Sequence, residues 1–167
     1  FDREHSRLSL IQAALKEAGV ERLGAEEEKL SHAEYLGYEK ALGMELLPAQ
    51  AIFSELRASK SEEEIGYLRE AQAISEKALA EVLRIIKPGM TERQVAAELV
   101  YHMLLNGSEG NSFDPIVITG KKTSMPHGVP GDEVIHEGDF VTMDFGCLKH
   151  GYCSDMTRTV AIGYVTD

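Results

Sequence analysis

The sequence is short of basic residues, of cysteine and of long apolar runs, and each shortage excludes a class of protein. Its 17 lysines and arginines are outnumbered by 28 aspartates and glutamates, which gives a formal net charge of -11. Proteins that bind nucleic acid need clustered basic residues, so we expect no nucleic-acid partner. No uninterrupted apolar stretch of about 18 residues is present, so we also expect no membrane partner.

Only two cysteines occur, Cys147 and Cys153, and they do not form a zinc-ligand pattern. We interpret both as small strand residues of a reduced, cytoplasmic protein. The 167 residues, 43% of them hydrophobic, are enough for one domain or for parts of two. The chain begins at Phe1 rather than Met and ends at Asp167 directly after a predicted strand, so we expect a piece of a longer protein.

The first third of the chain alternates between helical and extended patterns. Helices are predicted up to Gly19, from Ser31 to about Leu42 and over 49–57, with short strands over 20–25 and 44–47. This order predicts that residues 1–57 are part of an α/β N-terminal domain. The polar residues 58–61 then mark the boundary of a second domain, 58–167.

Two long helices open the second domain, and each begins with a capping box. Ser61 with Glu64 starts the first helix and Thr91 with Gln94 starts the second, with a break at Pro88-Gly89. The predicted buried stripes are Ile65, Leu68, Ala71, Ser75, Ala78, Val82 and Ile86 in the first helix, and Val95, Leu99, Met103 and Leu104 in the second. We expect both stripes to pack on one face of a sheet.

Extended segments follow the helices over 115–119, 139–146 and 151–163, and they are rich in Val, Thr, Phe and Tyr. Helices followed by antiparallel strands are typical of an α+β fold. Pairing the last two segments around Lys149-His150 predicts that Asp144 lies directly opposite Asp155. The turn is not of the favoured Asn-Gly type, and a slip of one residue would place the two aspartates on opposite faces.

Two opposed carboxylates repel each other, so something must offset the repulsion. A shared proton could do so, as could Arg158, although strand alternation places Arg158 on the other face. A divalent cation is the third possibility, since carboxylate oxygens suit Mn, Mg, Ca or Zn. The alternative is an ordinary hairpin in which one aspartate is only a turn or edge residue.

A loop rich in Gly and Pro precedes these strands and carries His127 between Pro126 and Gly128. The prolines restrict this loop, and the glycines let its backbone turn or approach a neighbour closely. A histidine held in this way can act as a general acid or donate to an oxyanion. The alternative is an ordinary surface histidine.

The segment MPHGVPGDEVIHEGDFVTMDFGCLKHGYCSDMTRTV, residues 125–160, resembles the pita-bread metallopeptidases, which include methionine aminopeptidase, aminopeptidase P and prolidase. GYCSDMTRT, together with the helix LRASKSEEEIGYLREAQAISEKAL, is similar to the Xaa-Pro group within that family. The resemblance implies the first half of a pita-bread catalytic domain. It also implies that Asp144 and Asp155, eleven residues apart, are metal ligands, and that His127 lies at the substrate.

By this resemblance the site holds two divalent ions, with Mn as the first candidate and Co, Zn or Fe as alternatives. Asp144 binds one ion and Asp155 bridges both, which lowers the pKa of a shared water and polarises the scissile carbonyl. The family has a further histidine and two further glutamates as ligands, but residues 156–167 contain neither type.

The resemblance therefore implies hydrolysis of Xaa-Pro peptide bonds in short peptides by a full-length, homodimeric enzyme, while this chain alone is inactive. The alternatives are a methionine aminopeptidase and a non-catalytic binding module of the same fold. The N-terminal segment and the long first helix disfavour the former, and the two intact aspartates disfavour the latter. The same aspartates disfavour creatinase-like hydrolysis without metal.

Overall fold

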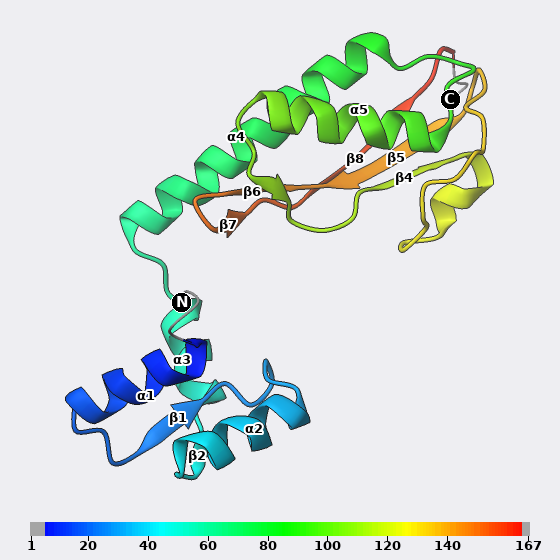
Figure 1. The fold of residues 1–167 in the computed structure, drawn as a ribbon. Coiled ribbons are helices and arrows are strands. Elements are labelled where there is room, and N and C mark those ends of the chain that lie inside the picture. The colour runs from blue at the N-terminus through cyan, green and yellow to red at the C-terminus, as the bar shows by residue number, and fades with distance from the viewer. Residues whose placement is uncertain (1–5, 165–167) are drawn as a thin grey trace. The chain divides into compact units, whose positions relative to one another are not determined.

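The computed structural model describes residues 6–164. The two chain ends, Phe1 and Asp167, from which we expected a piece of a longer protein, lie outside these residues. The chain divides between Lys60 and Ser61 into two compact units (Figure 1). Among the described residues no helix is long and apolar enough to cross a membrane.

The first unit contains helices α1 (Arg7–Glu17), α2 (His32–Leu42) and α3 (Gln50–Ala58) and strands β1 (Leu23–Ala25) and β2 (Leu46–Pro48). The two strands pair in parallel, so the predicted alternation of helix and strand is confirmed. The predicted capping box opens α2, and Gly43 ends it in the left-handed conformation. The N-terminus of α3 lacks a cap of its own. The Glu27 carboxylate instead accepts from the Ala49 N–H at 3.0 Å and so takes the place of a capping side chain.

The second unit begins with helices α4 (Glu62–Ile85) and α5 (Glu92–Leu105). Both predicted capping boxes are formed, at Ser61 and at Thr91. The strands that follow are β3 (Gly110–Asn111), β4 (Ile116–Thr119), β5 (Phe140–Phe145), β6 (Cys147–Lys149), β7 (Tyr152–Cys153) and β8 (Met156–Ala161), with a short 3₁₀ helix η1 (Gly120–Ser124) after β4. They form two antiparallel sheets, in the orders β4-β5-β8 and β3-β6-β7.

The predicted register of the last hairpin is wrong. Asp144 pairs with Thr157 instead of Asp155, and Lys149 pairs with Tyr152. The turn therefore lies one residue later, at His150 and Gly151, whose φ angles are 51° and 77°. A two-residue hairpin turn of the favoured twist needs positive φ at both central positions, and Gly151 supplies the second of these without strain. Moving the turn by one residue changes each cross-strand partner by two positions and leaves every side chain on its face.

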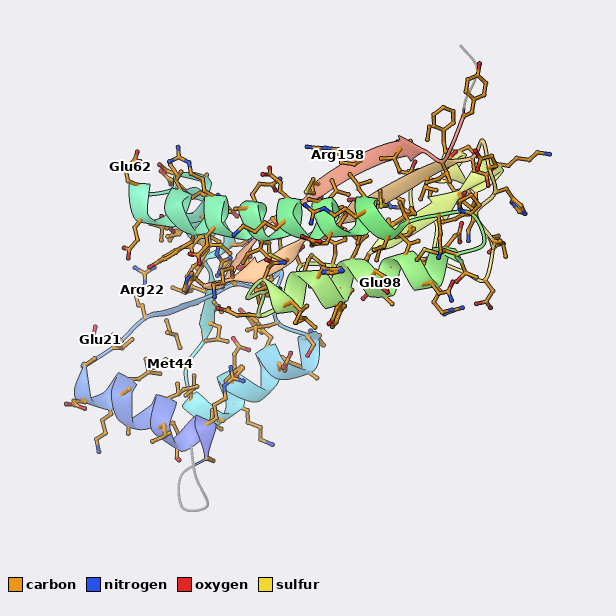
Figure 2. All side chains as sticks on the ribbon, turned by 90° about the horizontal axis from the view of Figure 1, so that it is seen from above. Glu21, Arg22, Met44, Glu62, Glu98 and Arg158 are labelled. Atoms are coloured by element: carbon orange, nitrogen blue, oxygen red, sulfur yellow. The ribbon has the colours of Figure 1, made fainter. Side chains whose placement is uncertain are left out.

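The core lies between the two helices and one face of the β4-β5-β8 sheet. Val141, Met143 and Phe145 alternate along β5 and are fully buried against the helices. Figure 2 looks down on α4 and α5, which lie side by side over the strands, with Glu98 labelled on α5. Most members of the predicted stripes are buried, namely Ala71, Ser75, Ala78, Val82, Val95, Leu99 and Met103. Ile65, Leu68 and Ile86 are half-buried, and Ile74 and Glu92 are buried although neither stripe included them. The expected packing on one face is thus confirmed.

One member of the predicted stripe, Leu104, is 52% exposed, so that part of the prediction is wrong. Successive residues in a helix are about 100° apart. Met103 takes the position that faces the core and is fully buried, so its neighbour must turn away.

We predict that Leu99→Ala lowers the free energy of unfolding by about 2–5 kcal/mol, because it removes a fully buried side chain and leaves a cavity. Leu104→Ala on the same helix serves as the control and should change it by no more than about 0.5 kcal/mol. Urea unfolding followed by circular dichroism measures both. Equal losses for the two variants would contradict the assignment of this core.

Candidate functional site

Asp144 lies on β5 opposite Ile116 of β4 and Thr157 of β8. Its chain neighbours Met143 and Phe145 are buried against the helices, so strand alternation turns Asp144 to the opposite, helix-free face. Its Oδ1 atom is buried and has no hydrogen-bond partner among the residues that the structure describes. A buried carboxylate oxygen is costly unless a donor or a cation meets it.

Asp155 lies in the gap between β7 and β8 and is exposed. Ser154 and Met156 on either side of it are buried on the side of the helices, so strand alternation turns Asp155 toward the face of Asp144. The gap in which Asp155 lies also borders α4. When the hairpin register is continued across the gap, Asp155 stands opposite Gly146. The two aspartates are therefore diagonal neighbours on one face, where directly opposite positions were predicted.

The backbone at this gap is held by a buried hydroxyl that the sequence analysis did not identify. The Ser154 hydroxyl accepts from the Cys147 N–H at 3.0 Å and shares a hydrogen bond of 2.8 Å with the Ser75 hydroxyl. Ser75 comes from the middle of α4, where its spacing indicated only a core position. Two signals were available in the sequence: Ser75 is a polar residue within an apolar helical stripe, and Ser154 directly precedes Asp155. The network fixes the residue that directly precedes Asp155.

Gly146 is required here because the strands approach closely. A Cβ at this position would meet the Ser154 carbonyl oxygen and the Ser112 hydroxyl. The glycine that follows Asp144-Phe145 in the sequence thus permits the gap in which Asp155 lies.

Arg158 does not offset the charge of either aspartate in the described part of the chain. It pairs across the strands with Met143, on the side of the helices, as strand alternation predicted. Its guanidinium donates to the Thr157 carbonyl at 2.7 Å. A shared proton or a cation therefore remains as the partner that the Asp144 carboxylate lacks.

His127 is exposed on the loop between η1 and β5. A Cβ on the next residue, Gly128, would stand 2.8 Å from the Ile118 side chain, so this part of the loop rests on Ile118. Ile118 pairs with Thr142, two positions along β5 from Asp144, and shares the face of Asp144. The loop therefore lies on the helix-free face, although within residues 6–164 no hydrogen bond joins His127 to either aspartate.

No group of three or more His, Cys, Asp and Glu side chains that could hold a metal ion occurs in the part of the chain that the structure describes. The two aspartates do fit part of such a site, because they offer hard oxygen donors on one face and because the Asp144 Oδ1 atom lacks a partner within residues 6–164.

A groove of about 500 Å³ runs beside Asp155 along α4. Its lining includes the charged and polar side chains of Arg69, Gln72 and Glu76. Asp155 is thus accessible, in contrast to the buried Oδ1 atom of Asp144.

Comparison with known proteins gives a consistent result. The sequence model of metallopeptidase family M24 matches residues 66–167. The Xaa-Pro dipeptidase of Pyrococcus furiosus is 38% identical over 125 residues, which are 75% of this chain and 36% of that protein. The solved Xaa-Pro dipeptidase from Bacillus anthracis superposes with a TM-score of 0.87 at 38% identity, over 98% of this chain and 46% of that one. An X-Pro aminopeptidase from Thermotoga maritima gives 0.89 at 32% identity, over 99% and 47%.

The fold and the matched residues define a pita-bread protein, as the resemblance implied. The chain belongs to metallopeptidase family M24. It spans less than half the length of these relatives. The predicted α+β fold, the first half of a pita-bread catalytic domain preceded by part of an α/β domain, is confirmed by the solved structures.

We predict that Gly146→Ala lowers the free energy of unfolding by about 1–3 kcal/mol, because the added methyl group overlaps backbone that cannot move freely. Gly66→Ala is the matched control, since its site in α4 is open. There alanine should raise the free energy of unfolding by about 0.5–1 kcal/mol. Thermal unfolding of both variants tests this. A Gly146→Ala protein as stable as the wild type would contradict the close approach of the strands.

Proposed function

We propose that Asp144, Asp155 and His127 form the first part of a metal-dependent peptidase site, and that the protein hydrolyses the Xaa-Pro bond of short peptides. The observation that carries the proposal is the Asp144 Oδ1 atom, which is buried on the face shared with Asp155 and has no partner among the residues that the structure describes. Relatives named Xaa-Pro dipeptidase and X-Pro aminopeptidase support the choice of substrate.

Asp144 and Asp155 would hold the metal, with Mn as the first candidate. Bound divalent ions supply Lewis-acid chemistry and an activated water at neutral pH. Asp144 presents a preorganised oxygen, because the buried strand residues on either side of it fix its backbone. His127, on the loop over the same face, would donate a hydrogen bond to the scissile carbonyl as negative charge develops there.

We predict that Asp144→Asn in the full-length protein lowers kcat/KM on an Xaa-Pro dipeptide by more than about 100-fold. Removing a residue that only hydrogen-bonds to a metal ligand typically lowers metal affinity or activity by about 10–100-fold, and removing the ligand itself should lower it further. Without metal the unfolding free energy should not fall, because the amide removes a negative charge of which one oxygen, Oδ1, is buried without a partner among the described residues.

Asp155→Asn should behave in the same way, while Asp132→Asn is the matched control. Asp132 is 84% exposed and accepts from Arg93, and an amide oxygen can keep that bond. Wild-type activity in both site variants would contradict the proposal. Activity on peptides that begin with Met, with none on Xaa-Pro peptides, would indicate a methionine aminopeptidase instead.

We further predict that the 167-residue chain alone binds Mn weakly and does not cleave Xaa-Pro peptides. Two carboxylates leave an ion mostly solvated, and no third ligand gathers with them within residues 6–164. Calorimetric titration of Mn into this chain, beside the full-length protein, measures the difference. Tight binding of two ions, or turnover by the chain alone, would show that these residues suffice.

A further inference from the structure

The most deeply buried charge in the second unit belongs to Glu92, the first residue of α5. Its side chain is fully buried, although the sequence shows only an ordinary acid in the first turn of a helix. Its Oε1 atom accepts from the Thr119 N–H at 2.8 Å. Its Oε2 atom accepts from the Gly131 N–H at 2.8 Å and from the Lys122 ammonium at 2.6 Å. All three donors come from one segment of the chain.

Lys122 ties the same segment from its own side. Its ammonium group also donates to the Val129 carbonyl at 2.8 Å and lies 3.5 Å from the Glu133 carboxylate. The hydrogen bond to Glu92, with further support from the charges of Glu92 and Glu133, raises the pKa of Lys122 above its ordinary value. The ammonium therefore stays charged throughout the neutral range.

These contacts surround the loop that carries His127. Thr119 precedes the loop and Gly131 ends it, so one carboxylate joins its two ends. The hydrogen bond from Lys122 to the Val129 carbonyl spans the loop, and His127 lies between these two residues in the sequence. Figure 1 shows η1 and the start of α5 at the same end of the unit. Beyond these anchors, Gly128 rests on Ile118, on the face of Asp144.

A pair of this kind is poorly explained by stability alone. Burying the Glu92 carboxylate costs free energy that its attraction to the partly exposed Lys122 ammonium only partly returns, and apolar replacements of buried ion pairs are often as stable. The charged pair instead provides directional hydrogen bonds, because each oxygen of Glu92 accepts from a particular backbone N–H. The arrangement thus specifies one loop conformation.

We propose that Glu92 and Lys122 are positioning residues, which hold the loop 120–131 so that His127 stands over the face of Asp144 and Asp155 and meets the substrate. This inference rests on the proposed peptidase function. It assigns to α5 a part in the reaction that the sequence did not indicate.

The test is a double-mutant cycle in the full-length, metal-loaded protein. Glu92→Gln and Lys122→Met are each made in the wild type and in the His127→Ala variant, with Asp132→Asn as the control because its side chain is 84% exposed and makes no hydrogen bond or ion pair with Glu92 or Lys122. A displacement of about 1 Å at a reacting group can cost about 100-fold. We therefore expect each positioning variant to lower kcat on an Xaa-Pro dipeptide by about 10–100-fold with little change in KM, while the control stays near wild type.

In the His127→Ala background the same substitutions should cost less than about 3-fold, because the residue through which they act is already gone. Equal losses in both backgrounds would overturn the proposal and leave the pair a purely structural role. Amide hydrogen exchange gives a second readout that does not depend on activity. The Thr119 and Gly131 amides should be protected in the wild type and lose that protection in Glu92→Gln, while exchange in α4 is unchanged.

Unprotected Thr119 and Gly131 amides in the wild type would also overturn the proposal, even if Glu92→Gln failed to fold. Failure of the proposed function is distinguishable from this result. A wild type that is active on peptides beginning with Met and inactive on Xaa-Pro peptides would remove the substrate assignment only. The same cycle, run with the Met peptide, would then decide the role of the pair.

Discussion

The packing of alternate β5 residues against α4 and α5 is the constraint on which the rest of the second unit depends. Val141, Met143 and Phe145 are completely buried between the strand and the helices. Because strand side chains alternate, this contact fixes Asp144 on the opposite face. The hydrophobic core thus determines the face of the sheet on which the Asp144 carboxylate lies, and a slip of β5 by one residue would bury that carboxylate among apolar side chains.

Around this strand the protein uses backbone hydrogen bonds to place the other candidate residues. The Ser154 hydroxyl bonds the Cys147 N–H and so fixes the gap before Asp155. The Glu92 carboxylate performs the corresponding task for the loop that carries His127. The helices contribute to both anchors, since Ser75 of α4 bonds the Ser154 hydroxyl and Glu92 belongs to α5. Rigid support of polar groups is the arrangement expected of a preorganised site.

The sequence predicted the parts of the fold that local chemistry decides. Capping boxes at Ser61 and Thr91 gave the starts of the long helices, because the side chains that close each box are three residues apart. The hairpin register was not predicted correctly, since neither Lys149-His150 nor His150-Gly151 is the favoured Asn-Gly turn, and the positive φ angles at His150 and Gly151 select the latter. Ser154 and Glu92 were not identified because their partners, Ser75 and Lys122, are 79 and 30 residues away. The roles of Asp144, Asp155 and His127 stay predictions from the resemblance.

The central claim is that the unpaired oxygen of Asp144 is a metal ligand. The most direct measurement is an anomalous-difference map from crystals of the full-length protein grown with Mn, with data collected at the manganese edge. Our account predicts a peak within bonding distance of Asp144 Oδ1 and a shared contact with the Asp155 carboxylate. A fully loaded crystal whose manganese peaks all lie elsewhere, with Asp144 Oδ1 bonded to a protein donor or to water, would contradict it.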